Sequence, residues 1–334
     1  MASRREASVL GTYRYLRVAM VLLVVLLSAS VVLQIFGPEP DCWQRSVSAY
    51  YYTPARAVFV ACLCAIGACL VVYRGNTDAE DVALNASGLL AFVVAFVPTQ
   101  VDDTCPASNV PSPAELDTAV TNNVWALFVA GVALVGVSWF LRARTAPDER
   151  GGSLSLWPLV VSSAALVVLP AVLVRWHDAV RDHGHDVAAT ALFAGILVVV
   201  GMNALGLARH SAGAGRGARP AANRYSAIGL TMLVSFAGLL LTHRAIPGFR
   251  QWLFWIEALL IVEFAVYWVM QTVELWYVVQ RNDSPRPSPG LTTPAPPPAA
   301  SAADHSAAGD AAAGEPAGDD PGPLAGERAP VRGG

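Results

Sequence analysis

Eight long apolar runs, separated by short polar segments, make up most of the chain between residues 18 and 279. An apolar helix needs about 20 residues, each rising ~1.5 Å, to cross a hydrocarbon core of about 30 Å. Because hydrocarbon offers no partner for unpaired backbone groups, runs of this length are predicted to be helices rather than isolated strands. The predicted helices are Val18–Phe36, Ala55–Tyr73, Val82–Val97, Asn122–Leu141, Leu154–Val174, Val187–Ala208, Tyr225–Thr242 and Gln251–Val279.

This pattern predicts an all-α fold, a polytopic transmembrane helix bundle of about eight helices within residues 18–279. The placement of arginine predicts its orientation, because basic residues are retained on the cytoplasmic side of a membrane. With residues 1–17 inside, the cytoplasmic segments up to Arg286 hold fourteen arginines, and the opposite side holds six together with most of the acidic loop residues. A count of seven helices would destroy this alternation. We therefore expect both ends of the chain to lie in the cytoplasm.

The two ends of the chain differ in composition. From Arg281 onward the sequence consists mainly of Pro, Ala, Gly and Ser with scattered acidic residues. Such a segment cannot bury enough apolar surface to offset its chain entropy, so residues 280–334 are predicted to be a disordered cytoplasmic tail. At the other end, the small residues Ser28–Ser30 allow an alternative interpretation as a cleaved signal peptide. The apolar run continues through Phe36, which favours a retained helix.

Composition narrows the class of protein. Of the 334 residues, 54% are hydrophobic and 14% are charged, whereas soluble domains carry about a quarter charged residues. The net charge of -3 gives nucleic-acid binding no electrostatic basis. All 22 Lys and Arg residues are arginine, a bias typical of GC-rich bacterial genomes. We therefore expect a multi-pass protein of a bacterial cytoplasmic membrane, with the lipid bilayer as its main partner.

The five cysteines fall into two groups. Cys42 and Cys105 lie in the first and second predicted external loops, on the oxidising side of the membrane, where a disulfide between them is one interpretation. Two free thiols are the alternative, because the geometry of the bond is strict. The other three, Cys62, Cys64 and Cys69, share one apolar run and are interpreted as packing residues. No spacing matches a zinc ribbon or a redox motif.

Oxygen and imidazole groups gather in the predicted external loops. Asp102 and Asp103 lie in the second loop, and His183 and His185 lie in the third. These are ligand types of divalent metals such as zinc. The alternative interpretation is a solvated loop or the beginning of the sixth helix, because no spacing places the ligands together on one helix face.

Polar residues inside the apolar runs are the candidate ligand-binding groups. A carboxylate at membrane depth is costly and normally faces the interior of a bundle, where it has a partner. In the last predicted helix Glu263 shares a face with Tyr267, and Glu257 points about 120° away from Glu263. Asn85 is a candidate partner, as is Asn203 in the sixth helix. One interpretation is a proton relay or polar ligand site, and the other is hydrogen bonding that fixes helix packing.

Arg56 is a cation near the beginning of the second predicted helix, on the predicted outer side. Its side chain either extends to the headgroup level or pairs with an external acid such as Asp102. The tyrosines at positions 50–52, just before it, fit an aromatic belt at the membrane surface.

Several motifs resemble a family of bacterial multi-spanning membrane proteins that is defined only as a domain of unknown function. They are Ser46-x-Ser48-x-Tyr50-Tyr51-Tyr52-Thr53 with Arg56, Tyr73-Arg74-Gly75, Glu80-Asp81, Asn85, Pro98-Thr99, Phe254-Trp255-Ile256-Glu257-Ala258-Leu259 and Tyr267-Trp268, with His185 at the entrance to the sixth helix. The resemblance covers mainly the second, third and eighth predicted helices. It implies a membrane helix bundle and no particular reaction.

A more distant similarity links the chain to the seven-helix membrane hydrolases that include alkaline ceramidases. That similarity implies a zinc site in which Ser48, Asp102 or Asp103, and His185 are the counterparts. The chain departs from the pattern, because its last helix carries Glu257 and Glu263 in place of paired histidines. The departure puts the zinc site in doubt.

Two functional hypotheses follow. The first is a membrane protein without enzymatic activity or cofactor, which binds, senses or transports a small or lipid ligand through Arg56, Asn85, Glu257, Glu263 and Tyr267. The second is a metal-dependent lipid hydrolase with its site facing outward.

Overall fold

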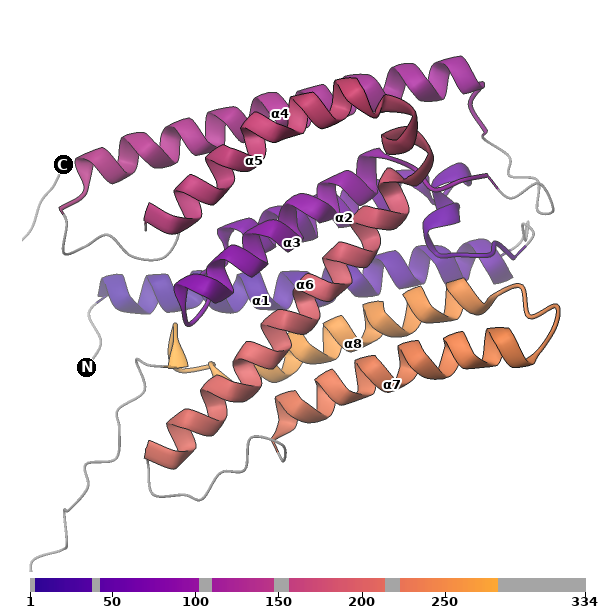
Figure 1. The fold of residues 1–334 in the computed structure, drawn as a ribbon. Coiled ribbons are helices and arrows are strands. Elements are labelled where there is room, and N and C mark those ends of the chain that lie inside the picture. Colours follow the sequence, from indigo (N-terminus) through magenta and orange to yellow (C-terminus); the bar gives the residue numbers. More distant parts are fainter. Residues whose placement is uncertain (1–3, 38–42, 102–109, 147–155, 214–222, 282–334) are drawn as a thin grey trace, which may run out of the picture. The chain divides into compact units, whose positions relative to one another are not determined.

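The computed structural model describes residues 4–37, 43–101, 110–146, 156–213 and 223–281. Within these ranges the chain forms eight α-helices and one short 3-10 helix, η1, and contains no strand (Figure 1). The predicted all-α bundle of eight helices is confirmed. The elements are α1 (Arg4–Phe36), η1 (Ser48–Tyr52), α2 (Arg56–Val72), α3 (Asp78–Phe96), α4 (Pro113–Arg144), α5 (Leu156–Arg175), α6 (His177–Gly213), α7 (Arg224–Ala245) and α8 (Trp252–Glu274).

Several helices extend beyond the apolar runs that predicted them. α4 begins at Pro113, where the Ser112 side chain accepts a hydrogen bond from the Glu115 backbone N–H and the Glu115 side chain accepts one from the Ser112 N–H. This reciprocal capping explains why the helix starts before its apolar run. α6 begins at His177, so the segment predicted as the third external loop is mostly helical.

Among the described residues, six helices are long and apolar enough to cross a membrane, and two apolar helices are shorter. The chain is therefore a membrane protein. Within the described residues, α4 buries only Val120 and α5 only Pro158 and Leu159, and both helices expose many large apolar side chains. Such surfaces are unfavourable in water and favourable in hydrocarbon. The long helices are Ser8–Phe36, Asp78–Phe96, Pro113–Arg144, His177–Ser211, Arg224–Ala245 and Trp252–Glu274, and the shorter ones are Arg56–Val72 and Leu156–Val172.

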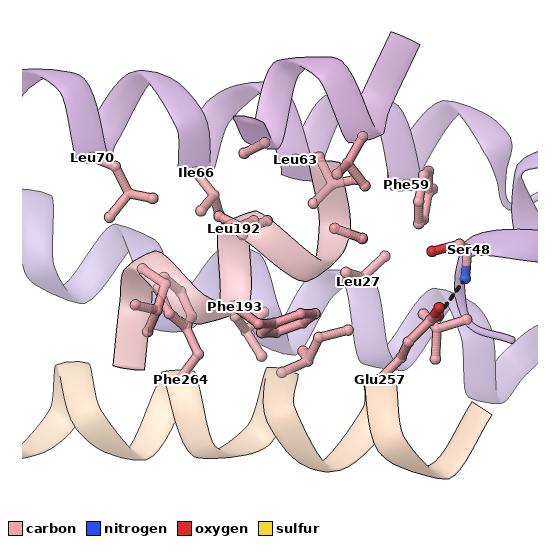
Figure 2. Close-up of a pocket in the computed structure, with 17 residues that line it drawn as sticks. Leu27, Ser48, Phe59, Leu63, Ile66, Leu70, Leu192, Phe193, Glu257 and Phe264 are labelled. Atoms are coloured by element: carbon pink, nitrogen blue, oxygen red, sulfur yellow. Dashed lines mark hydrogen bonds between the residues drawn. The ribbon is translucent and has the colours of Figure 1, made fainter. Parts of the chain in front are cut away.

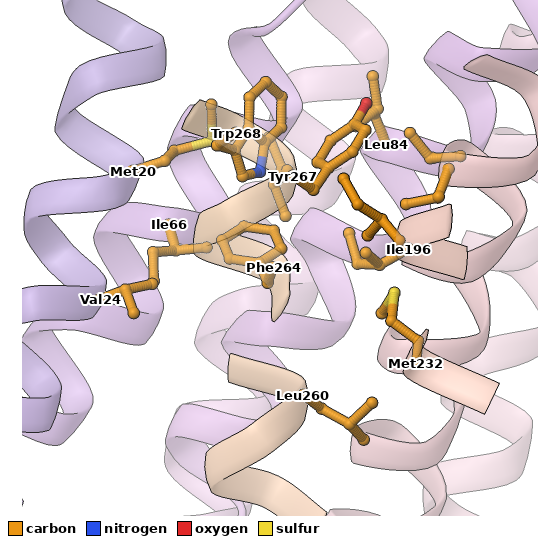
Figure 3. Packing of buried hydrophobic residues seen from close by; sticks show 14 of the residues in the cluster. Met20, Val24, Ile66, Leu84, Ile196, Met232, Leu260, Phe264, Tyr267 and Trp268 are labelled. Carbon is orange, nitrogen blue, oxygen red and sulfur yellow. The ribbon is translucent and has the colours of Figure 1, made fainter. Parts of the chain in front are cut away.

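The main apolar core lies among α1, α2, α3, α6, α7 and α8. Figure 3 shows Phe264, Tyr267 and Trp268 of α8 among side chains from the neighbouring helices. Tyr267 and Trp268 are fully buried, and the ring of Trp268 meets that of Tyr73 edge to face with centroids 4.9 Å apart. α8 therefore contributes the largest side chains of this core.

α3 packs against both α2 and α6, and small residues allow the close approach. A Cβ atom added to Gly67 of α2 would lie 2.7 Å from the carbonyl oxygen of Gly88 of α3, and one added to Gly88 would lie 2.6 Å from the carbonyl oxygen of Gly67. On the other side, a Cβ added to Gly195 of α6 would lie within van der Waals overlap of the Ser87 hydroxyl. Side chains larger than hydrogen would separate these backbones.

Candidate ligand-binding site

The segment before α2 is attached to the beginning of α8. The backbone N–H of Phe254 donates a hydrogen bond of 2.8 Å to the carbonyl oxygen of Arg45. The ring of Trp43 contacts that of Phe254 edge to face, with centroids 5.5 Å apart. All five residues of η1 are buried, although three of them are tyrosines. This segment is therefore part of the interior, and the predicted aromatic belt at residues 50–52 is not an exposed surface.

Glu257 of α8 meets this segment at the end of an apolar cavity. Its Oε2 atom accepts a hydrogen bond of 2.8 Å from the backbone N–H of Ser48 (Figure 2). The cavity has a volume of about 70 Å³, whereas a single water needs only about 10–15 Å³. The remaining side chains that line it are apolar: Val24, Leu27, Val47, Phe59, Leu63, Ile66, Leu70, Ala91, Val94, Ala189, Leu192, Phe193, Ile196, Ile261 and Phe264.

The chemistry of this cavity is that of an amphipathic site. None of its lining residues is exposed, and Glu257 and Ser48 are its only polar ones. The lining comes from α1, η1 and the residue before it, α2, α3, α6 and α8, so the cavity lies where these elements meet. A carboxylate at the edge of an apolar cavity can accept hydrogen bonds from a guest that fills the apolar space.

A second group of polar residues forms a buried polar cluster: Arg17, Tyr73, Glu80, Asn203, Tyr225, Tyr267, Gln271, Glu274 and Arg281. Asn203 of α6 lies at its centre and is fully buried. Its Nδ2 atom donates to Oε1 of Glu80 at 2.7 Å and to the hydroxyl of Tyr267 at 3.1 Å, and its Oδ1 atom accepts from Nη2 of Arg281 at 3.1 Å. The cluster thus joins α3, α6, α8 and the residues after α8.

Glu274 carries the second half of this cluster. Its carboxylate accepts hydrogen bonds from Nε of Arg281 at 2.8 Å and from the hydroxyl of Tyr225, and it forms an ion pair of 3.1 Å with Arg224. Burial alone would lower the pKa of Arg281, but the hydrogen bond and charge of Glu274 outweigh burial and raise that pKa. Arg281 therefore stays charged, and its charge is neutralised inside the protein.

Arg17 closes the cluster from the side of α1 and is fully buried. Its guanidinium donates to the carbonyl oxygens of Leu275 at 2.9 Å and Val279 at 2.8 Å, and to the hydroxyl of Tyr73 at 3.1 Å. Both carbonyl groups belong to residues that follow the last residue of α8, where regular helical hydrogen bonding has ended, and the buried arginine supplies them with charged donors. Arg17 thereby joins α1 to the end of α8.

The five predicted ligand-binding residues lie at different places. Glu257 lines the cavity, and Tyr267 belongs to the polar cluster. Glu263 faces α7, where its Oε1 atom accepts a hydrogen bond of 2.9 Å from the hydroxyl of Ser235 and its Oε2 atom is buried without a hydrogen-bond partner. The suggested partner Asn203 bonds to Glu80 and Tyr267 instead.

The other two predicted residues belong to neither group. Asn85 is half-buried on α3 and takes no part in the polar cluster. Arg56 donates a hydrogen bond of 2.7 Å to the hydroxyl of Tyr51 and lies over its ring. No hydrogen bond or ion pair joins any two of the five predicted residues within the described part of the chain, and their role in binding stays a prediction.

The predicted metal site is described only in part. His185 lies inside α6, buried, and its Nδ1–H donates a hydrogen bond of 2.7 Å to the carbonyl oxygen of Val97, whereas His183 is exposed. Asp102 and Asp103 lie outside the described residues, as do both cysteines of the predicted disulfide, Cys42 and Cys105. Among the residues described, no group of three acidic, histidine or cysteine side chains is arranged to hold a metal ion. The zinc site, and the hypothesis that Ser48 belongs to a hydrolase site, stay predictions.

The polar cluster was largely missed by the sequence analysis. Arg17 and Arg281 were counted only as cytoplasmic charges, and Arg281 was placed in the tail, whereas it is 5% exposed and its backbone N–H donates to Oδ1 of Asn76. Glu80 is equally buried and had appeared only as part of a motif. The sequence did contain one indication of this burial. Each of these charged residues lies within a few residues of an apolar run, where a long side chain can reach either the protein interior or the solvent.

The chain has also been compared with known proteins. No protein-family model matches it, and no curated protein or solved structure is significantly similar to it. The two resemblances described from sequence motifs stay predictions.

Proposed function

We propose that this membrane protein binds a small amphipathic ligand in the apolar cavity, with the polar group of the ligand at Glu257. The observation that supports the proposal is a carboxylate held at the end of a space whose other lining residues, apart from Ser48, are apolar. A concave, mostly apolar site with few convergent polar groups is the usual form of a small-molecule site. The volume of about 70 Å³ favours a short apolar body rather than a whole lipid.

The carboxylate also specifies the polar group of the ligand. One oxygen of Glu257 is already held by the backbone N–H of Ser48. The carboxyl oxygens of Glu257 accept hydrogen bonds, so a ligand that supplies a donor matches this group. A protonated amine adds charge attraction to the hydrogen bond and is favoured over a neutral donor. The class proposed is therefore a short alkylamine.

Thermal unfolding of the purified protein in lipid nanodiscs, with and without n-butylamine, tests this proposal. A ligand present at ten times its Kd stabilises the folded state by about 1.4 kcal/mol. We expect n-butylamine to raise the unfolding temperature of the native protein and to have less effect on Glu257→Gln. Glu263→Gln is the matched control on the same helix, because Glu263 does not line the cavity. Ala189→Leu should also remove the response by filling the cavity.

Two outcomes would contradict the proposal. One is an equal response in the native protein, Glu257→Gln and Ala189→Leu, which would mean that the amine acts through the bilayer. The other is no response in the native protein at concentrations up to those that disrupt the nanodisc.

We also propose that the chain crosses a bacterial cytoplasmic membrane eight times, with both ends inside. The distribution of arginine supports this topology, because up to Arg286 the segments assigned to the cytoplasm hold fourteen and the opposite segments hold six. A single cysteine introduced between Arg209 and Arg224, in a background lacking the native cysteines, should be protected from a membrane-impermeant maleimide in intact cells. Labelling at that position in intact cells would overturn the topology.

A further inference from the structure

A second hollow lies outside the apolar cavity, between α2, α3 and α4 at the end where α2 begins. This groove has a volume of about 650 Å³. Its polar lining residues include Tyr51, Arg56 and Asn123, and the apolar ones include Ala57 and Ala61 of α2. From Arg56 to Ala61 the helix rises about 7.5 Å. The groove therefore combines a cationic, hydrogen-bonding part with a trough formed by small side chains.

Arg56 is only partly engaged by the protein. Its Nη2 donates to the Tyr51 hydroxyl at 2.7 Å, and its guanidinium carbon lies 4.3 Å from the centroid of the Tyr51 ring. These contacts hold the planar group in one orientation and leave most of its five N–H donors available. No carboxylate of the described residues lies within ion-pair distance of Arg56, so its charge is not neutralised by the part of the chain that the structure describes.

The trough below Arg56 has the form of a chain-binding surface. Ala57 and Ala61 are both exposed on α2, and their small side chains leave a channel beside the larger Phe96 of α3. In a membrane protein this channel opens to hydrocarbon, and the amide of half-buried Asn123 on α4 adds donors to the groove. A molecule with an anionic head group and an acyl chain matches the groove, because the head group complements Arg56 and the chain fits the channel along Ala57 and Ala61.

We propose that this groove binds an anionic phospholipid, with its phosphate on Arg56 and an acyl chain along Ala57 and Ala61. Charge complementarity identifies the occupant: the groove supplies one cation without a counterion among the described residues, and arginine is suited to phosphate by its planar array of donors. A phospholipid with net negative charge is favoured over a zwitterionic one, because the latter brings its own cation to the same surface.

Native mass spectrometry of the protein released from mixed micelles tests this proposal. The probes are phosphatidylglycerol and phosphatidylcholine of identical chains, titrated separately. We expect phosphatidylglycerol to be retained preferentially by the native protein. Removing the cation in Arg56→Gln should weaken that binding at least about fivefold, and Ala61→Leu should weaken it by filling the trough while leaving Arg56 in place.

Two control variants distinguish this site from general lipid contact. Arg244→Gln removes an exposed arginine from the last turn of α7, outside the groove. Ala68→Leu enlarges another exposed alanine of α2 that does not line the groove. Both should retain phosphatidylglycerol as the native protein does. Retention by Arg56→Gln and Ala61→Leu equal to that of the native protein would overturn the proposal, and so would equal losses in the control variants.

Discussion

The Nε atom of Arg281 donates a hydrogen bond of 2.8 Å to Oε1 of Glu274, seven residues earlier in the chain, and both side chains are almost completely buried. Arg281 also donates to Oδ1 of Asn203 on α6. The residues that follow α8 are thus attached to the interior of the bundle by the guanidinium group of Arg281, which donates hydrogen bonds to both Glu274 and Asn203.

Arg281→Ala should lower the free energy of unfolding by about 3 kcal/mol, because it leaves the buried carboxylate of Glu274 without its main partner. Denaturation by SDS in mixed micelles measures the change. Arg209→Ala is the control: Arg209 is exposed on α6, and its removal should change the free energy by less than about 0.5 kcal/mol. Equal effects of the two substitutions would show that Arg281 is not buried in the membrane-bound protein.

Replacing two asparagines by leucine, one inside the polar cluster and one outside it, tests how much the cluster contributes to stability. Asn203→Leu should cost about 3 kcal/mol or more, because it removes the partners of Glu80, Tyr267 and Arg281 at once. Asn85→Leu should change stability by less than about 0.5 kcal/mol, because Asn85 is half-buried and outside the cluster. A large loss for Asn85→Leu would indicate a partner or ligand at Asn85 and return it to the set of binding residues.

Glu263 and Ser235 provide a test of whether the carboxylate fixes helix packing. Ser235→Ala should cost about 1–2 kcal/mol, because it removes the hydrogen-bond partner of a buried carboxyl group. The double variant Glu263→Leu with Ser235→Ala should be more stable than Ser235→Ala alone, since no buried polar group is then left unpaired. Ser138→Ala is the control, because Ser138 is half-buried and its side chain donates to a carbonyl oxygen of its own helix, that of Leu134. A double variant that folds but is less stable than Ser235→Ala alone would argue against a packing role.

Gly67 and Gly136 should respond in opposite directions to the same added methyl group. In Gly67→Ala the new Cβ would lie 2.7 Å from the carbonyl oxygen of Gly88, so α2 and α3 must separate, at a cost of about 1–3 kcal/mol. At Gly136 of α4, apart from the adjoining backbone of its own helix and its two chain neighbours, no described atom lies within 4 Å of the new Cβ. Gly136→Ala should leave stability unchanged or raise it by up to about 1 kcal/mol. Thermal unfolding of both variants in one detergent checks the prediction, and a neutral Gly67→Ala would contradict the close packing of α2 and α3.

The helices were predictable because each apolar run satisfies a local requirement, a length that spans hydrocarbon without polar interruptions. Their ends were less predictable where polar residues continue a helix beyond the apolar run, as in the first turns of α6 that contain His183 and His185. A histidine in that position is compatible with either a loop or a helix, and its own sequence context does not determine which of the two forms.

The candidate site depended on contacts between distant residues. Glu257 was identified from the cost of burying a carboxylate, but its partner is a backbone N–H 209 residues away, which no side-chain pattern reveals. Glu80 and Asn203 lie 123 residues apart and were not paired for the same reason. The topology argument only counts the arginines on each side of the membrane and does not depend on where their side chains point. The count therefore could not predict that the side chain of Arg17 is buried.

α8 carries Glu257 near one end and Glu274 at the other, 23 residues of uninterrupted helix in all. Between these carboxylates the axis extends for about 25 Å, and a continuous helix bends little over that length. The helix is therefore expected to move as one rigid body. A tilt that moves Glu257 away from Ser48 would also displace the other end of α8, where Arg17 and Arg281 form hydrogen bonds. Those hydrogen bonds therefore oppose a change at the cavity from the opposite end of the helix.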